Sequence, residues 1–117
     1  MKVLQGSLKE TQYKWPDREV TEDQYLPLQA QGSTLLSRDD VTYISDKHGL
    51  HKIMNPDRQE YAVSLHLYAP PNAAKEGCQI FDEETGKATH VIQYDLYSEM
   101  GQKQKCGKTC GHRVMGP

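Results

Sequence analysis

Residues 61–68, YAVSLHLY, are the stretch that decides the fold class of this chain. Apolar and polar residues alternate through it, and the Pro70-Pro71 pair ends it. Alternation with a period of two is typical of a β-strand, because successive side chains point to opposite faces of the sheet. The pattern divides the side chains between two faces: Tyr61, Val63, Leu65 and Leu67 on one, and Ser64, His66 and Tyr68 on the other.

Other segments show the same period and are separated by turn residues. Strands are expected at residues 1–4, 8–15, 41–44 and 50–54. A hairpin is expected from residues 78–81 and 88–97, with Gly86 supplying a positive φ in the turn between them. Residues 18–31 are polar and predict a loop followed by an edge segment. Short strands, many turns and almost no helix indicate an all-β antiparallel barrel or sandwich.

Composition narrows the class of protein further. The chain has 117 residues, which suits one domain, and its 14 basic and 16 acidic residues give a formal charge of −2. This balance gives no attraction to nucleic acid or to an anionic membrane, and no apolar run is long enough to span a bilayer. Residues 1–10 lack the apolar core of a secretory signal, and three cysteines, an odd number, suggest reduced thiols in the cytoplasm.

The composition changes after Gly101. We expect residues 1–101 to form one partial domain and residues 102–117 to form a flexible, basic tail rich in Cys and Gly. The tail carries Cys106, Cys110 and His112, whose spacing resembles half of a zinc site. A structural zinc site needs four ligands, so a small zinc-dependent module is the weakest of the readings left open.

Two groups of residues have the chemistry of a site. Ser64, His66 and Tyr68 stand at alternate positions of one strand, where Ser could orient the imidazole and the imidazole could bond the phenol. The alternative is an ordinary solvated sheet face. His51 follows Gly49 at the start of a strand, where a ring nitrogen could face a metal, with Asn55 bracing it. A lone histidine is also common as a surface or core residue.

Five runs, in order, resemble the cysteine dioxygenase family of cupin barrels. They are residues 2–17 (KVLQGSLKETQYKWPD), 43–55 (YISDKHGLHKIMN), 62–71 (AVSLHLYAPP), 78–87 (CQIFDEETGK) and 98–101 (SEMG). The resemblance covers residues 1–101 and corresponds to the C-terminal half of the family's chain. It implies a cupin-type antiparallel β-barrel, jelly-roll-like and incomplete at its N-terminal side.

The resemblance also implies an activity and its residues. The family holds one Fe²⁺ through three histidines and oxidises L-cysteine with O2 to cysteine sulfinic acid, a step of cysteine catabolism toward taurine and sulfate. His51 matches the third iron ligand. Tyr68 matches the active-site tyrosine, and His66 and Ser64 match the residues that hold it in place.

The family's pattern is incomplete in this chain. The family's H-x-H iron ligands, its cross-linking cysteine and its substrate-binding arginine all precede the run that begins at Lys2, and none is present here. We therefore expect the chain alone to lack activity, since one imidazole does not hold Fe²⁺. The alternative is an inert truncated cupin that serves as a β-rich interaction module. Self-association through an exposed sheet edge stays open in either case.

Overall fold

The chain is all-β and antiparallel, as the sequence predicts. The structure is a computed structural model and describes residues 1–17, 20–21, 24–92 and 98–103. Within these ranges the strands are β1 (Lys2–Gln5), β2 (Leu8–Tyr13), β3 (Ala30–Leu36), β4 (Leu50–Met54), β5 (Val63–Leu65), β6 (Cys78–Phe81), β7 (Ala88–Val91), β8 (Ser98–Glu99) and β9 (Gln102–Lys103). None of the helices in the described ranges is long and apolar enough to cross a membrane.

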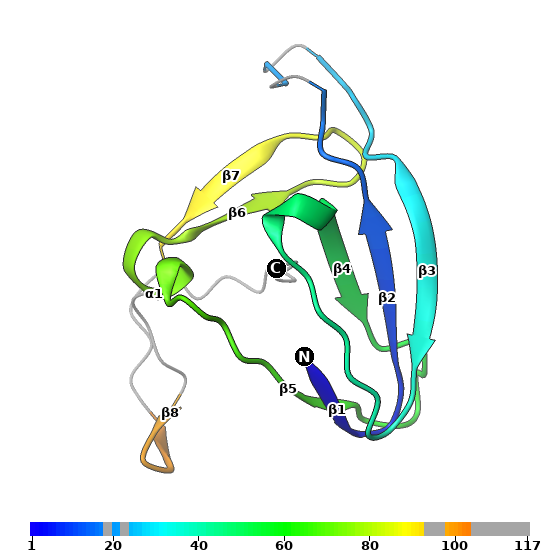
Figure 1. The fold of residues 1–117 in the computed structure, drawn as a ribbon, viewed down its shortest axis with the longest axis vertical. Coiled ribbons are helices and arrows are strands. Elements are labelled where there is room, and N and C mark those ends of the chain that lie inside the picture. The colour runs from blue at the N-terminus through cyan, green and yellow to red at the C-terminus, as the bar shows by residue number, and fades with distance from the viewer. Residues whose placement is uncertain (18–19, 22–23, 93–97, 104–117) are drawn as a thin grey trace.

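The strands form four small sheets that do not close into a single barrel in the described part of the chain. The largest has the order β3-β2-β4, and β1 pairs with β5, β6 with β7, and β8 with β9. Figure 1 shows the first three sheets as consecutive walls around a common interior, with β1–β5 at the bottom, β3-β2-β4 at the right and β6–β7 at the top. Strand β2 is the central strand of the largest wall.

A small apolar core fixes the lower part of this arrangement. Val3 is completely buried, and Leu8 and Leu36 are almost so. Met1, Ile53 and Ala62 pack against them as half-buried neighbours. The core therefore joins the β1–β5 pair to the three-stranded sheet, because its members come from both.

The largest differences between the predicted and the observed strands are at three places. Residues 41–44 form only an isolated bridge, between Val41 and Lys2, and not a strand. β5 covers three of the eight residues predicted for it, because its only strand partner in the described chain, β1, is four residues long. Conversely, β3 runs on to Leu36, beyond the edge segment expected to end at residue 31. Pairing partners, which a local pattern does not reveal, set these lengths.

The apolar face predicted for residues 61–68 is exposed. Val63 is 45% and Leu65 60% exposed, whereas Ser64 between them is half-buried. Tyr61 and Leu67 are also largely exposed. Among the described residues nothing packs over this face of β5.

Two short helical turns connect the strands. The 3₁₀ turn η1 (Asp46–His48) forms where the sequence predicts a turn, and Gly49 ends it. The five-residue helix α1 (Asn72–Glu76) was not expected from the sequence. Its boundaries, Pro71 before it and Gly77 after it, are the residues that commonly start and stop a helix.

The predicted hairpin is present as β6 and β7. Asp82 begins its turn: its Oδ1 accepts hydrogen bonds from the backbone N–H groups of Glu84 and Thr85 and from the Thr85 hydroxyl. Gly86 has a φ of +70°, and a Cβ there would lie 2.2 Å from the carbonyl oxygen of Leu26. Residues 93–97, also expected in the second strand, lie outside the described residues.

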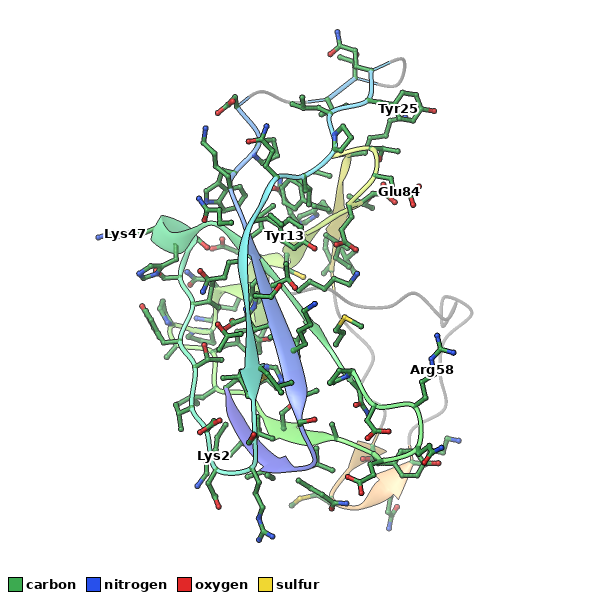
Figure 2. The ribbon with its side chains drawn as sticks, turned by 90° about the vertical axis from the view of Figure 1, so that its right-hand side faces the viewer. Lys2, Tyr13, Tyr25, Lys47, Arg58 and Glu84 are labelled. Carbon is green, nitrogen blue, oxygen red and sulfur yellow. The ribbon has the colours of Figure 1, made fainter. Side chains whose placement is uncertain are left out.

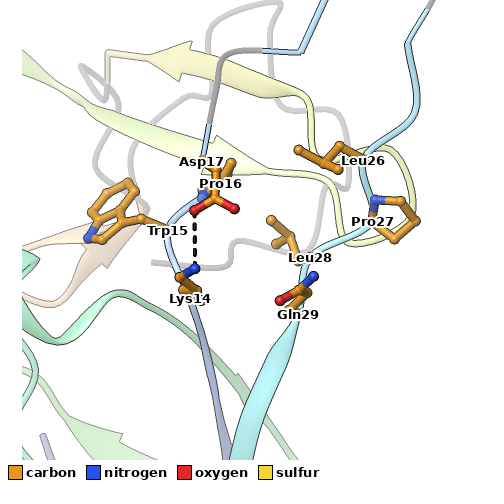
Figure 3. Close-up of a pocket in the computed structure, with 8 residues that line it drawn as sticks. All are labelled: Lys14, Trp15, Pro16, Asp17, Leu26, Pro27, Leu28 and Gln29. Carbon is orange, nitrogen blue, oxygen red and sulfur yellow. Dashed lines mark ion pairs between the residues drawn. The ribbon is translucent and has the colours of Figure 1, made fainter.

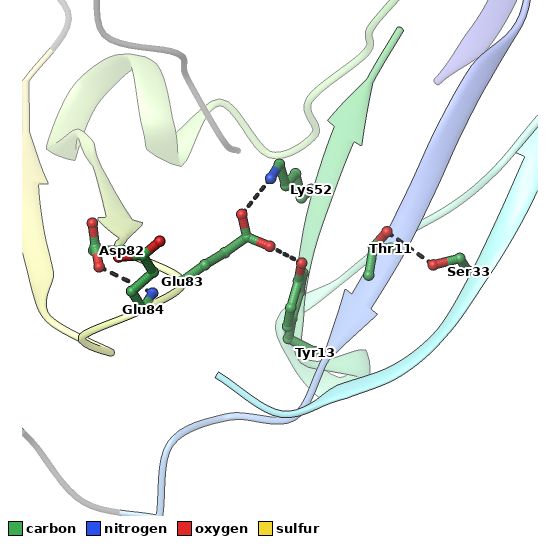
Figure 4. Close-up of polar contacts among 7 residues, drawn as sticks. All are labelled: Thr11, Tyr13, Ser33, Lys52, Asp82, Glu83 and Glu84. Atoms are coloured by element: carbon green, nitrogen blue, oxygen red, sulfur yellow. Dashed lines mark hydrogen bonds and ion pairs between the residues drawn. The ribbon is translucent and has the colours of Figure 1, made fainter. Parts of the chain in front are cut away.

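A polar clamp holds the hairpin against the large sheet. The Tyr13 hydroxyl of β2 and the Lys52 ammonium of β4 both donate to the Glu83 carboxylate in the hairpin turn (Figure 4). In Figure 2, Tyr13 lies beside the hairpin that carries Glu84, and Lys47 extends away from the sheets. Burial and the Glu83 contact raise the pKa of Tyr13 to about 12, and the bonds from Lys52 and Tyr13 lower the pKa of Glu83.

The two adjacent leucines at the end of β3 provide a test of the core. Leu36 is 7% and Leu35 is 62% exposed. We expect Leu36→Ala to lower the free energy of unfolding by about 2–5 kcal/mol, because it removes buried methyl groups and leaves a cavity. Leu35→Ala should change it by less than about 0.5 kcal/mol. Urea denaturation of the two variants measures both values, and equal losses would contradict the proposed core.

The clamp predicts a loss of stability at high pH. The pKa of Tyr13 is about 12 in the folded chain, against 10.0 for a free phenol. The stability that this phenol contributes is therefore complete below about pH 10 and is lost as the pH rises toward 12. Glu83→Gln should move the Tyr13 pKa back toward 10, which ultraviolet titration of tyrosinate would measure, and an unchanged Tyr13 titration would argue against the clamp.

Candidate active site

Gly49 sets the start of β4 and therefore the place of His51. Its φ of +99° lies in the region that favours glycine, and a Cβ would come within 2.3 Å of the Tyr13 carbonyl oxygen. Leu50 then pairs with Tyr13 and His51 with Gln12, in antiparallel register. Because side chains alternate along a strand, His51 and Ile53 share the face that carries the core.

The His51 imidazole is buried and makes one recorded hydrogen bond. Its side chain is 8% exposed, and its Nδ1 lies 2.7 Å from Oε1 of Glu10 on β2. The second oxygen of Glu10 accepts a hydrogen bond of 2.7 Å from the Thr42 hydroxyl. The other ring nitrogen, Nε2, has no hydrogen-bond partner among the described residues. That nitrogen is the atom of His51 that is free to contact a ligand.

Ser64 and His66 make the hydrogen bond considered from their spacing, whereas His66 and Tyr68 are joined by ring stacking and not by the hydrogen bond considered for them. The Ser64 hydroxyl lies 3.0 Å from His66 Nε2. The His66 and Tyr68 rings stack at a centroid distance of 6.1 Å, with 16° between their planes. Ser64 is in β5, opposite Val3 of β1, while His66 and Tyr68 follow β5 on the way to α1. The serine hydroxyl therefore contacts the imidazole, and the imidazole contacts the phenol ring.

The electrostatic surroundings favour the neutral forms of both rings. Partial loss of hydration lowers the pKa of His66, and the charge of the Met1 amine lowers it further, as does His51 whenever its ring is protonated. Loss of hydration also raises the pKa of Tyr68, and the negative charge of a Cys78 thiolate adds to this. At neutral pH Tyr68 is thus a hydroxyl donor, and His66 favours its uncharged form.

His51 and the Ser64–His66–Tyr68 chain are electrostatic neighbours, but no hydrogen bond or ring stacking joins them in the described part of the chain. A small, partly open hollow lies elsewhere, between residues 14–17 and 26–29 (Figure 3). Its volume of about 30 Å³ is room for roughly one water molecule. No group of three His, Cys, Asp or Glu side chains in the described residues could hold a metal ion.

Sequence reasoning missed Glu10, Thr42 and Cys78 as neighbours of these residues. Glu10 alternates with Leu8 on the buried face of β2, and an acidic residue at such a position is the signal that could have identified it. Thr42 is in a loop and gives no signal. Asn55, considered as a brace for His51, instead donates to the carbonyl of Glu60.

The cysteine and zinc predictions are tested only in part. Cys78 is a free thiol and is half-buried. Cys106, Cys110 and His112 lie outside the described residues, as does the tail from residue 104 onward. The zinc module therefore stays a prediction.

The chain is similar to known cysteine dioxygenases. The sequence profile of "Cysteine dioxygenase type I" matches residues 1–84. Cysteine dioxygenase type 1 of Danio rerio is 37% identical over 103 residues, which are 88% of this chain and 47% of that protein. The Homo sapiens protein of the same name is 40% identical over 101 residues, or 86% of this chain and 46% of that protein.

The chain spans about half the length of these curated relatives. The profile nonetheless covers most of the chain and includes Glu10, His51 and the Ser64–His66–Tyr68 segment. The all-β cupin-type fold expected from the sequence agrees with it. On this match, the chain belongs to the cysteine dioxygenase type I family.

Proposed function

We propose that this chain supplies the C-terminal half of an iron-dependent cysteine dioxygenase domain, which oxidises L-cysteine with O2 to cysteine sulfinic acid. The observation that carries the proposal is the setting of His51, a buried imidazole whose Nδ1 is bonded to a carboxylate and whose Nε2 is left for a ligand. Histidines that bind metals are commonly held in this way. The same assignment makes the protein a cytoplasmic enzyme of cysteine catabolism toward taurine and sulfate.

The described residues fit one part of an iron site. His51 offers a neutral nitrogen donor of the kind that Fe²⁺ accepts, but a stable site needs more donors than the described residues bring together. We infer that the two remaining histidines of the family's ligand set come from the other half of the domain. The chain alone is therefore expected to be inactive.

The chain's own residues would bind and orient the substrate. Tyr68 keeps its proton at neutral pH, so its hydroxyl can donate to the carboxylate of cysteine. The Ser64–His66 pair holds the Tyr68 ring through the stacking contact. When bound, Fe²⁺ would supply O2 activation and favour the thiolate form of cysteine.

The first test joins this chain to the upstream half of the Danio rerio relative and measures iron per chain. We expect the joined protein to bind close to one Fe²⁺ and to produce cysteine sulfinic acid, and the 117-residue chain alone to do neither. In the joined protein, His51→Ala should abolish iron binding, because it removes a ligand.

His48→Ala is the matched control for this substitution. His48 is three residues upstream, exposed, and bonded through Nδ1 to the nearby Ser45 hydroxyl. It should leave the iron content unchanged. Full iron loading of the His51→Ala protein would show that His51 is not a ligand.

The second test separates catalysis from iron binding. In the joined protein, Tyr68→Phe should lower kcat on the order of 10²-fold, because the phenol donor is lost, while the iron content stays the same. Tyr61→Phe is the control, since Tyr61 is 85% exposed on the same segment. Loss of iron in Tyr68→Phe would instead make Tyr68 a ligand or a folding residue.

The exposed apolar residues of the β5 segment favour a second candidate. In this candidate the chain is an inert cupin fragment that binds another chain or a second copy of itself. The bound chain would cover the exposed side chains of Val63 and Leu65. The iron measurement distinguishes the two candidates. A joined protein that folds but neither binds iron nor oxidises cysteine would support the interaction module.

A further inference from the structure

We propose that Glu10 is the positioning residue of His51: it fixes the proton of the imidazole on Nδ1 and so presents the lone pair of Nε2 to the metal. The inference rests on the proposed function for the identity of the metal. The protonation pattern itself belongs to the metal-free chain and is tested there.

Glu10 is an unusual residue for its position. It is 3% exposed and is the one buried polar or charged residue in the described part of the chain. It alternates with the core residue Leu8 on β2, where an apolar side chain would be expected. Burial of a carboxylate is unfavourable unless hydrogen bonds and opposite charges compensate. Glu10 therefore costs the folded chain a desolvation free energy that Leu at position 10 would not.

Both oxygens of the carboxylate are used. Oε1 lies 2.7 Å from Nδ1 of His51, and Oε2 accepts a hydrogen bond of 2.7 Å from the hydroxyl of Thr42. The backbone of Thr42 is itself held, since its N–H donates to the Met1 carbonyl and its carbonyl accepts from the Met1 amine. Glu10 is thus bound from two sides and cannot rotate away from His51 without losing a bond.

The length of the glutamate side chain matters to this contact. The residue directly opposite Glu10 on β4 is Ile53, whereas His51 stands opposite Gln12. Glu10 therefore reaches His51 along the diagonal between neighbouring strands, a separation that long side chains can span. The contact is set by the register of β2 and β4 and is not a chance approach of two mobile surface groups.

The chemistry of the pair determines the tautomer. An ionised carboxylate only accepts hydrogen bonds, so Nδ1 of His51 must carry a proton to bond with it. In the neutral imidazole, Nε2 is then unprotonated and has a lone pair. Nε2 has no hydrogen-bond partner among the described residues. A metal ion is the ligand that such a nitrogen suits.

The test begins with nuclear magnetic resonance of the 15N-labelled 117-residue chain without metal. Long-range 1H–15N correlations distinguish a protonated ring nitrogen from an unprotonated one. We expect neutral His51 to be protonated at Nδ1. A His51 protonated at Nε2 in the folded wild-type chain would overturn the proposal, and this outcome requires no variant.

Glu10→Gln then tests whether the Glu10 carboxylate is what fixes the tautomer of His51. The amide oxygen can accept from Nδ1–H, and the amide NH2 can instead donate to an unprotonated Nδ1. The Nδ1–H form should therefore lose its predominance while the volume of the side chain is kept. Glu84→Gln is the matched control, because Glu84 is an exposed glutamate of the hairpin turn. A folded Glu10→Gln chain with an unchanged His51 tautomer would overturn the proposal.

The link to the metal is measured in the joined protein described above. Glu10→Gln should weaken Fe²⁺ binding about 10–100-fold, the range found for residues that orient metal-binding histidines. Unchanged affinity would overturn the proposal. A wild-type joined protein that binds no Fe²⁺ would contradict the proposed function instead, while the tautomer of the metal-free chain would still decide the role of Glu10.

Discussion

The pairing of β2 with strands on both of its edges is the constraint on which the rest of the structure depends. β3 lies along one edge and β4 along the other, each in antiparallel register with residues 8–13 or 9–13 of β2. Alternate side chains of β2 then face opposite sides of the sheet. Leu8 and Glu10 face the core and the candidate site, while Tyr13 faces the hairpin. A slip of one residue would exchange these two sets.

This arrangement makes one strand responsible for two distant contacts. On one face, Glu10 bonds with His51, and on the other, Tyr13 bonds with Glu83 in the turn of the β6–β7 hairpin. The hairpin also carries Cys78, whose charge influences Tyr68. The contacts of Glu83 therefore place the hairpin, and with it Cys78, relative to the large sheet.

The local sequence pattern was sufficient to predict those elements whose conformation depends on their own residues and not on a distant partner. The hairpin turn was predictable because Asp82 and Gly86 have the side chain and the backbone freedom that the turn needs. The spacing of Ser64 and His66 allowed their contact but left an ordinary solvated face open as the alternative. The lengths of β3 and β5 were not predictable, since each depends on the length of its partner strand.

The candidate site residues were proposed from the order of motifs, whereas the contacts that support them needed the fold. His51 and Tyr68 stay candidates on that order, and the partner of His51 is 41 residues away in the sequence. A contact of that separation depends on strand register, which the period of a pattern does not give. A glutamate on the buried face of a strand was the available signal, and only the fold shows which imidazole it meets.

The backbone of Gly49 has a consequence for how mutations in this protein should be read. The residue carries no functional group, yet a side chain there would collide with the Tyr13 carbonyl, and the strand that follows would shift. Under the proposed function, a screen of the joined protein for lost iron binding would thus identify position 49 together with the histidine two residues later. Substitutions at the two positions would have the same effect for different reasons. A change at position 51 removes the imidazole, whereas a change at position 49 adds a side chain that displaces the imidazole.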